Sequence, residues 1–404
     1  MEEAGTVLIV ATMDTKSREI LYLEECLREC GVPFLSLDAG IMGTSPFPVT
    51  VTREEIALAG GMALAEVQKL SSEGEALGIM TRGAIHYAKE LYHNGKIKGI
   101  IGIGGSMGTT LGTGVMRTFP LGFPKIMIST MASRDTHSFV GTKDIMMLHS
   151  VCDLSGINRL TGKIIRNGAR AMAGMVKDAA PFSWSARPLV VVSTLGTTEK
   201  CVQVLKKELE DKGKEVVVFH TSGTGGESME EFIRDENVEA LIDLSLHEIM
   251  DHYFGGDYDA GADRGLSALR KGVPTVFIPG NIDFLVTGPL HTAQKRFPGR
   301  PSHAHNAAIT TIRTEASEVA SIADKLAGYC IEAKGPVSVV IPMKGFSAFD
   351  REGGPFYDPD AVNAFVKTIE SKLPPSIPLQ LVPFHINDPE FAHAVLEAHH
   401  GMMK

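Results

Sequence analysis

The chain has 404 residues, of which 44% are hydrophobic and 22% are charged, and its formal net charge is −9. This length exceeds what a single hydrophobic core usually supports, so the sequence predicts two domains. The acidic balance and the absence of a Lys/Arg-rich run argue against nucleic-acid binding, and no apolar run approaches the roughly 18 residues of a membrane-spanning helix.

The first predicted element is a buried strand at Thr6–Ala11, which begins a few residues after Met1. No secretory signal precedes it, and the number of cysteines, five, is odd. Both features are typical of a protein whose thiols stay reduced. We therefore expect a cytoplasmic protein that neither enters nor crosses a membrane.

The strand is followed by a polar turn at Thr12–Lys16, a helix over Ser17–Cys30 and a second strand over Val32–Leu37 that closes at Asp38. Strands that are apolar throughout are typical of parallel sheets whose two faces are both covered by helices. The opening of the chain thus predicts a doubly wound α/β domain.

The most informative stretch follows a third strand, which is predicted at Lys98–Ile103. Gly104, Gly105 and Gly108 come next, and a helix is predicted from Met107. Unpaired backbone amides and the positive end of a helix together attract phosphate or carboxylate, so we predict an anion-binding loop. The alternative is a glycine turn needed only for packing the helix against the sheet. The predicted binding residues are Thr12, Thr15, Lys16, Gly104, Gly105, Ser106, Met107, Gly108, Thr109, Ser129 and Thr130.

The second half of the chain repeats the first. Thr12 corresponds to Thr194 and Gly31 to Gly213, at a constant offset of 182 residues. Two later strands recur in the same order, because Gly99–Ile103 resembles Ala240–Leu244 and residues 122–128 resemble residues 272–278. We therefore predict two duplicated, Rossmann-like, doubly wound parallel-sheet domains that face each other across a cleft.

The predicted domains are residues 1–180 and 181–404, joined by the proline- and serine-bearing stretch at residues 177–188. Beyond the repeat, strands are predicted at Pro336–Pro342 and Leu379–Pro383, and a helix at Pro389–His399. These elements are expected to extend the second sheet.

Chemistry-bearing side chains follow several predicted strands, at the edge where parallel sheets bind ligands. In the first domain, Asp14 and Asp38 are candidates for holding Mg²⁺, although Asp14 could equally cap a helix. In the second domain, histidine and carboxylate take the place of the glycines. The candidate catalytic acids and bases are His220, His247, Glu248 and His305.

Several separated motifs together resemble the Tm-1-like ATP-binding family over nearly the whole chain. They are Ala11–Lys16, Gly104–Thr109, Ser129–Ser133, His305–Asn306 with Arg313–Thr314, and Asn387–Ala392. The resemblance implies two Rossmann-like domains, ATP with Mg²⁺ as ligands, and a homodimer. The chain departs from the family pattern at Met107, where the glycine motif usually carries another glycine.

The predicted function is a cytosolic ATP-binding protein that holds the nucleotide phosphates on the glycine loop in the cleft between the domains, with ATP-dependent chemistry on a small anionic substrate left open. Two alternatives stand beside it. In one, the protein is a regulator or scaffold in which ATP only stabilises a closed state. In the other, it is an enzyme that acts on a phosphorylated small molecule without any nucleotide.

Overall fold

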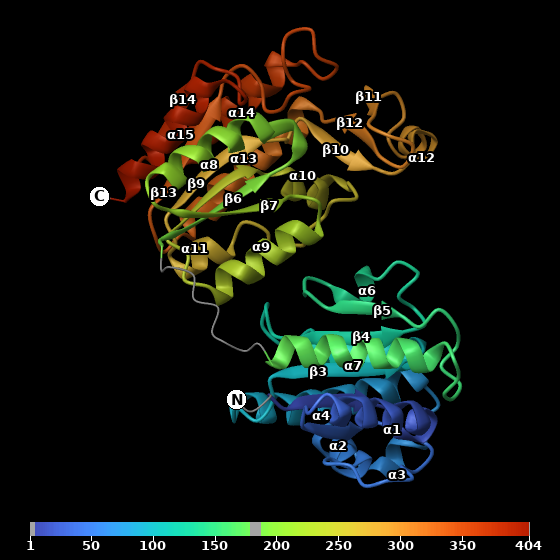
Figure 1. Cartoon of the computed structure of the whole chain (residues 1–404). Helices are drawn as coiled ribbons and strands as arrows, with labels where there is room; N and C mark the ends of the chain where they lie inside the picture. Colours follow the sequence, from blue (N-terminus) through green and yellow to red (C-terminus); the bar gives the residue numbers. More distant parts are fainter. Residues whose placement is uncertain (1–4, 178–186, 404) are drawn as a thin grey trace. The chain divides into compact units, whose positions relative to one another are not determined.

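The chain divides into two compact units, Met1–Ser183 and Trp184–Lys404. The computed structural model describes residues 5–177 of the first unit and residues 187–403 of the second (Figure 1). The predicted boundary between residues 180 and 181, and most of the predicted join, lie outside the described residues. Within the described residues, no helix combines the length and apolar character that crossing a membrane requires.

The N-terminal unit alternates strands and helices from its first element onward. Its elements are β1 (Val7–Ala11), α1 (Met13–Glu29), β2 (Phe34–Asp38), α2 (Arg53–Ala59), α3 (Leu64–Val67), α4 (Glu73–His93), β3 (Gly99–Gly104), α5 (Ser106–Met116), β4 (Lys125–Ser129), α6 (His137–Val140), β5 (Met146–His149) and α7 (Thr161–Lys177). The strands form one parallel sheet in the order β2-β1-β3-β4-β5. This is a doubly wound order, as predicted.

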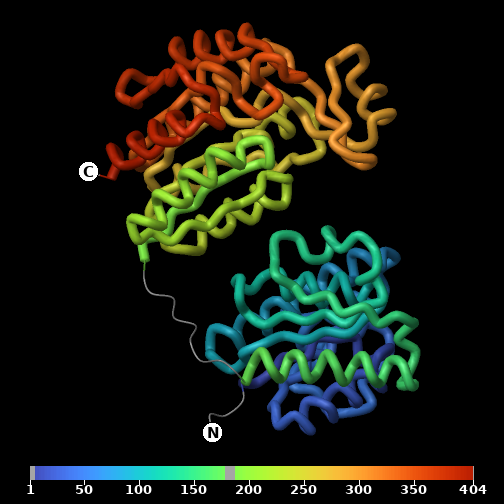
Figure 2. The backbone as a smooth tube through the Cα atoms, turned by 45° about the horizontal axis from the view of Figure 1, so that its top comes forward, coloured from blue at the N-terminus to red at the C-terminus, as the bar shows by residue number. Residues whose placement is uncertain are grey.

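Helices cover both faces of this sheet because successive strand residues point to opposite sides. Val7 and Ile9 of β1 belong to a core shared with α1 and α7, whereas Leu8 and Val10 belong to a core shared with α2, α4 and α5. All four side chains are buried. Figure 2 follows the backbone of this unit along the sequence. Burial on both faces explains why the strands lack a polar side.

The C-terminal unit has more elements but the same core arrangement. They are β6 (Leu189–Thr194), η1 (Gly196–Thr198), α8 (Glu199–Asp211), β7 (Glu215–His220), α9 (Thr224–Asp235), β8 (Ala240–Ser245), α10 (His247–Phe254), α11 (Ser267–Lys271), β9 (Thr275–Gly280), β10 (Phe284–Thr287), α12 (Leu290–Arg296), β11 (Ser302–Ala304), β12 (Thr310–Arg313), α13 (Ala316–Ile331), β13 (Val337–Pro342), α14 (Pro359–Lys372), β14 (Leu379–Val382) and α15 (Pro389–Met402).

The two parallel sheets share one strand order. The larger sheet runs β7-β6-β8-β9-β13-β14, so its first five strands repeat the order of the N-terminal sheet and β14 is added at the edge. The shared order agrees with the predicted duplication. Both predicted late strands belong to the larger sheet, but β13 takes the place of the fifth repeated strand, and only β14 and α15 lie beyond the repeat.

Two features of the fold differ from the prediction. The stretch Thr12–Lys16 is not a turn, because α1 begins at Met13 and the Thr12 carbonyl already accepts the Lys16 N–H at 3.0 Å. A small antiparallel sheet, β10-β12-β11, was not predicted at all. Its strands have only three or four residues, too few for hydrophobic periodicity to distinguish them from a loop.

Candidate functional site

The strand order of the N-terminal sheet creates a crevice between β1 and β3. The chain leaves β1 toward β2 on one side and later returns to β3 on the other side, so the loops that follow β1 and β3 diverge. In doubly wound sheets, ligands bind at this switch point, outside the carboxyl ends of the strands. The loop after β1 starts at Thr12, and the loop after β3 carries Gly105.

A cavity of about 620 Å³ opens at this point of the N-terminal unit. The loops after β1 and β3 both contribute to it, which brings together residues about ninety positions apart in the sequence. Of the predicted site residues, those that line it are Thr12, Asp14, Thr15, Lys16, Gly105, Ser106, Met107 and Gly108. The other predicted residues of this unit do not line the cavity.

The glycines of the loop have different roles. A Cβ on Gly104 would lie 2.6 Å from the Gly108 Cα, so only glycine fits where the end of β3 meets the first turn of α5. A Cβ on Gly105 would meet only the Thr130 Oγ1, at 3.9 Å. Gly105 is the N-cap residue of α5, and within the described residues no side chain caps this helix. The first-turn amides of α5 are therefore available to an anion.

Three of the predicted binding residues support the loop from behind. The Thr109 and Ser129 side chains are fully buried, and their hydroxyl oxygens lie 2.6 Å apart. The Thr130 N–H donates to the Gly104 carbonyl at 3.3 Å. These contacts join the loop after β3 to the end of β4, so we assign these residues a positioning role.

The other side of the cavity is formed by the first turn of α1. The Thr12 and Thr15 hydroxyls lie 2.8 Å apart, and both residues line the cavity. Lys16 also lines it, but its Nζ donates to the Leu154 carbonyl at 2.6 Å. The backbone of Lys16 is non-helical, with φ −123° and ψ 21°, so α1 is kinked at this residue.

Asp14 and Asp38 are both engaged with the backbone. The Asp14 Oδ2 accepts the N–H groups of Ile41, Met42 and Gly43 at 3.1–3.3 Å, and Asp14 lies inside α1 rather than capping it. The Asp38 Oδ1 accepts two backbone N–H groups, at 2.9 and 3.0 Å. Burial raises the pKa of the Asp38 carboxyl, and these two bonds act in the opposite direction.

The apolar side of the cavity was missed by the sequence analysis. It comes from the loop after β2 and from the helices that follow, a region in which no motif was recognised. Its apolar residues are Ala39, Ile41, Met42, Val67, Leu70, Ala76 and Leu77. Nothing in their spacing separates them from ordinary core residues, so only the folded chain identifies them. The cavity therefore has one polar, amide-rich side and one largely apolar side, to which the polar residues Gln68 and Glu73 also contribute.

The corresponding switch point of the C-terminal unit is filled by polar side chains. The Asn281 Nδ2 donates to the Ser245 Oγ at 2.9 Å and to the Thr198 Oγ1 at 3.3 Å, and the Thr197 hydroxyl donates to the Asn281 Oδ1 at 2.5 Å. Asn281 has φ +60°, a conformation that asparagine tolerates better than most residues. These bonds connect the loops after β6, β8 and β9 directly.

Two of the four predicted catalytic residues are enclosed by protein. His247 is fully buried, and its Nδ1 lies 2.9 Å from the Asn281 carbonyl oxygen. Burial lowers the pKa of His247, but the neighbouring Asp251 carboxylate, the Asn281 carbonyl and Glu248 together raise the pKa above its ordinary value. Glu248 is fully buried and accepts the Gly223 and Gly226 N–H groups and the Arg264 Nε. A substrate has no direct access to either side chain.

The other two candidates are exposed and stand on separate elements. His220 ends β7, and His305 lies between β11 and β12. A cavity of about 520 Å³ at the carboxyl ends of β13 and β14 is lined by neither of them, nor by His247 or Glu248. The four residues thus form no common site in the structure, and their catalytic role stays a prediction.

A buried carboxyl group outside the predicted catalytic, binding and metal residues lies in the same unit. Asp283 is fully buried and accepts a 2.6 Å hydrogen bond from the Ser347 hydroxyl on its Oδ2, while its Oδ1 has no hydrogen-bond partner among the described residues. Burial, and then the neighbouring Asp350 carboxylate, raises the pKa of Asp283 to about 7.

This raised pKa predicts a pH-dependent stability. The folded state binds a proton on Asp283 more tightly than the unfolded state, so Asp283 favours folding at low pH and this contribution is lost as the pH rises through about 7. Between pH 5 and pH 8, the free energy of unfolding should fall by about 3 kcal/mol more in the wild type than in Asp283→Asn. Urea unfolding at each pH measures this difference. Equal pH slopes in the two proteins would contradict it, and Asp263→Asn is a surface control.

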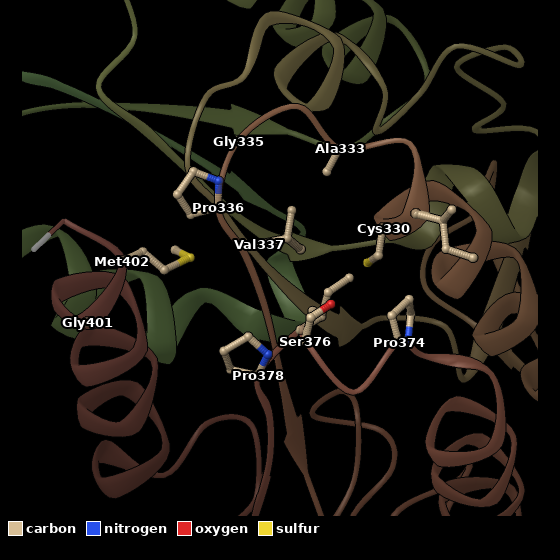
Figure 3. Close-up of a pocket in the computed structure, with 12 residues that line it drawn as sticks. Cys330, Ala333, Gly335, Pro336, Val337, Pro374, Ser376, Pro378, Gly401 and Met402 are labelled. Atoms are coloured by element: carbon tan, nitrogen blue, oxygen red, sulfur yellow. The ribbon is translucent and has the colours of Figure 1, made fainter.

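A further cavity, of about 560 Å³, lies at the other end of the strands of the larger sheet. It opens where β13 and β14 begin, and Figure 3 shows Pro336, Pro374 and Pro378 around it, with the sulfur atoms of Cys330 and Met402 nearby. Among the described residues, no charged side chain lines it. It offers an anionic ligand no counter-charge, in contrast to the cavity between β1 and β3.

Comparison with known proteins places the chain in a family. A model of the Uncharacterised protein family (UPF0261) N-terminal domain matches residues 5–181, and a model of its C-terminal domain matches residues 187–403. The chain belongs to the UPF0261 family. The two matches coincide with the two structural units, and the predicted resemblance to the Tm-1-like family is confirmed.

Relatives of this UPF0261 protein occur in bacteria and plants. A UPF0261 protein of Clostridium tetani is 36% identical over 400 residues, which are 98% of this chain and 99% of the relative. The ToMV resistance protein Tm-1(GCR237) of Solanum lycopersicum is 30% identical over 414 residues. The match takes in 97% of this chain but only 55% of the tomato protein, so the chain spans about half the length of that relative.

Proposed function

We propose that the N-terminal unit binds ATP, with the triphosphate on the backbone amides of residues 105–108 and the adenosine along the apolar side of the cavity. One observation carries this proposal. The loops after β1 and β3 line a single cavity at the switch point of a doubly wound sheet, with the uncapped start of α5 at one side. ATP, among nucleotides, is the choice that the Tm-1-like resemblance implies.

The apolar side of the cavity favours a nucleotide over a small phosphorylated metabolite. Val67, Leu70 and Leu77 supply apolar surface but no hydrogen-bonding side chain. A sugar phosphate would leave these residues in contact with water or with hydroxyl groups, whereas a purine ring buries apolar surface against them. Gln68 also lines this side of the cavity, and its Nε2 already donates to the Ile41 carbonyl at 2.6 Å.

Asp14 fits a magnesium ion bound together with the phosphates. Its Oδ1 is buried and has no hydrogen-bond partner among the described residues, although its Oδ2 is fully engaged. Within that part of the chain, no three His, Cys, Asp or Glu side chains group into a metal site. Mg²⁺ commonly takes only one or two carboxylates and completes its shell with phosphate oxygens and water. Bound Mg²⁺ would neutralise phosphate charge; Asp14 would orient it, and Asp38 would hold the backbone beside Asp14.

Calorimetric titration of the full chain with ATP, ADP and pyrophosphate, with and without MgCl₂, tests the proposal. We expect one ATP site per chain, because the second switch point is filled by Asn281 and its partners. ATP should bind at least about ten-fold more tightly than pyrophosphate if the apolar side holds the base. The variant Asp14→Asn should lose most of the magnesium dependence.

The titration also separates the alternatives. Equally weak binding of all three compounds would overturn the nucleotide proposal and favour the enzyme that acts on a phosphorylated small molecule. ATP binding without any product, with every substrate tried, would favour the regulator or scaffold. The predicted homodimer and cytoplasmic location are separate predictions that this experiment does not address.

A further inference from the structure

The segment formed by residues 150–156 follows β5 and is tied to both sides of the proposed phosphate site. At its start, the Ser150 N–H donates to the Ser129 carbonyl at 3.0 Å. Ser129 is the residue whose hydroxyl contacts Thr109 of α5, directly behind the glycine loop. Near its end, the Leu154 carbonyl accepts the hydrogen bond from the Lys16 Nζ. The segment thus contacts Lys16, which lines the cavity, and Ser129, which supports the glycine loop from behind.

Helix α1 holds the segment at a second point as well. The Gly156 N–H donates to the Glu19 Oε1 at 2.6 Å, and the Glu19 side chain is buried. The Leu154 side chain is also buried and belongs to the core that includes Met13 and Ile20 of α1. These contacts fix the Leu154 carbonyl relative to α1, so the position of this carbonyl and that of the Lys16 ammonium depend on each other.

Lys16 can serve the segment and an anion at once. An ammonium group has three donors, and the structure shows one of them engaged with the Leu154 carbonyl. Lys16 lines the cavity, and the kink of α1 lies at this residue. A charged phosphate oxygen is a stronger acceptor than a neutral carbonyl. Because one ammonium group can donate to both acceptors, a bound phosphate would restrict the Lys16 side chain while the bond to Leu154 persists.

The backbone of residues 150–156 contains a strained turn that contacts with the rest of the unit must hold in place. Val151 has φ +64°, and the Cys152 N–H donates to the Ser150 carbonyl at 2.7 Å, which closes a tight turn around a β-branched residue. The Val151 side chain is 62% exposed, so packing contributes little to holding this conformation. A strained turn persists only where the surroundings hold it, so a change at Lys16 should alter its order.

We propose that Lys16 couples occupancy of the phosphate site to the order of residues 150–156. The inference rests on the proposed function, because it takes the bound anion to be the phosphate of ATP. Phosphate bound at residues 105–108 contacts Lys16, Lys16 holds the Leu154 carbonyl more firmly, and the strained turn at Val151 opens less often. Because the hydrogen bond from Lys16 to the Leu154 carbonyl is present without a ligand, loss of the Lys16 side chain loosens the segment even without nucleotide.

Hydrogen–deuterium exchange of the full chain, with and without saturating ATP and MgCl₂, tests the coupling. In the wild type, we expect exchange of the peptide covering residues 150–156 to slow by at least about three-fold on binding. Without ATP, this peptide should exchange faster in Lys16→Met than in the wild type. When ATP occupies the same fraction of the variant, exchange of the peptide should not become slower. The control Lys163→Met removes an exposed lysine of α7 and should behave as wild type.

The possible results separate this inference from the proposed function. If calorimetry shows ATP binding while exchange of residues 150–156 is unchanged, the coupling is wrong and the proposed function stands. If ATP slows exchange of this peptide in Lys16→Met as much as in the wild type, the coupling does not pass through Lys16 and the inference is overturned. If neither ATP nor pyrophosphate binds, both proposals fall. Should Lys16→Met bind too weakly to saturate, the comparison without ATP still decides, because equal exchange in the two proteins contradicts the inference.

Discussion

Replacement of Gly105 by valine is expected to abolish ATP binding while leaving the protein folded. A Cβ at this position has room, because its nearest neighbour would be the Thr130 Oγ1 at 3.9 Å. The rest of the valine side chain would stand over the first-turn amides of α5, which the phosphates must approach closely. We expect the affinity to fall by about 100-fold or more and the melting temperature to change little. Calorimetry and thermal unfolding measure the two effects.

One substitution in the same loop and one in the C-terminal unit serve as controls for this result. Gly104→Ala places a Cβ 2.6 Å from the Gly108 Cα, so it should destabilise the N-terminal unit by about 3 kcal/mol. Gly196→Val changes the loop after β6, where a Cβ meets nothing within 4 Å, and should leave ATP binding intact. ATP binding by Gly105→Val at wild-type affinity would show that the amides of this loop do not hold the phosphates.

Replacement of Arg264 by methionine should have the largest effect on the stability of the C-terminal unit. The Arg264 guanidinium is buried and forms a bidentate ion pair with Asp243, at 2.7 and 2.8 Å. Its Nε also donates to Glu248 at 2.7 Å, and Glu230 lies 3.7 Å away. Removing the Arg264 guanidinium takes the positive charge of this residue away from three buried carboxylates. We therefore expect a loss of about 3–5 kcal/mol in the free energy of unfolding.

The effect of Arg264→Met is measured by urea unfolding of the full chain, followed by hydrogen exchange in peptides of the C-terminal unit. Arg270→Met is the matched control, because Arg270 forms an exposed ion pair with Asp263 and should lose less than about 0.5 kcal/mol. ATP binding by the N-terminal unit should survive in both variants. A loss below about 1 kcal/mol in Arg264→Met would contradict the structural role assigned to this network.

The fold could be predicted from the sequence because its strands are continuous apolar runs separated by helical periodicity. The strands β1, β3 and β8 were located within one residue of their observed bounds. The duplication was visible because Gly31 and Gly213 end equivalent helices at a constant offset. The small antiparallel sheet was missed because strands as short as Ser302–Ala304 carry too few alternations to be recognised.

The candidate site was predicted only in part, and the reason differs between its two sides. The amide-rich side was predictable because glycines after a buried strand leave a sequence pattern with a physical cause. The apolar side was not, since Val67 and Leu77 look like any core residue until the chain is folded. His247 and Glu248 were chosen for their chemistry and their place after a strand, but sequence does not reveal burial, and both face protein partners.

A crystal structure of the full chain with a non-hydrolysable ATP analogue and Mg²⁺ tests the central claim most directly. We predict phosphate oxygens at about 3 Å from the backbone nitrogen atoms of residues 105–108, and the base against Ile41 and Leu77. Phosphates held by the C-terminal unit, with residues 105–108 facing only water, would contradict the account.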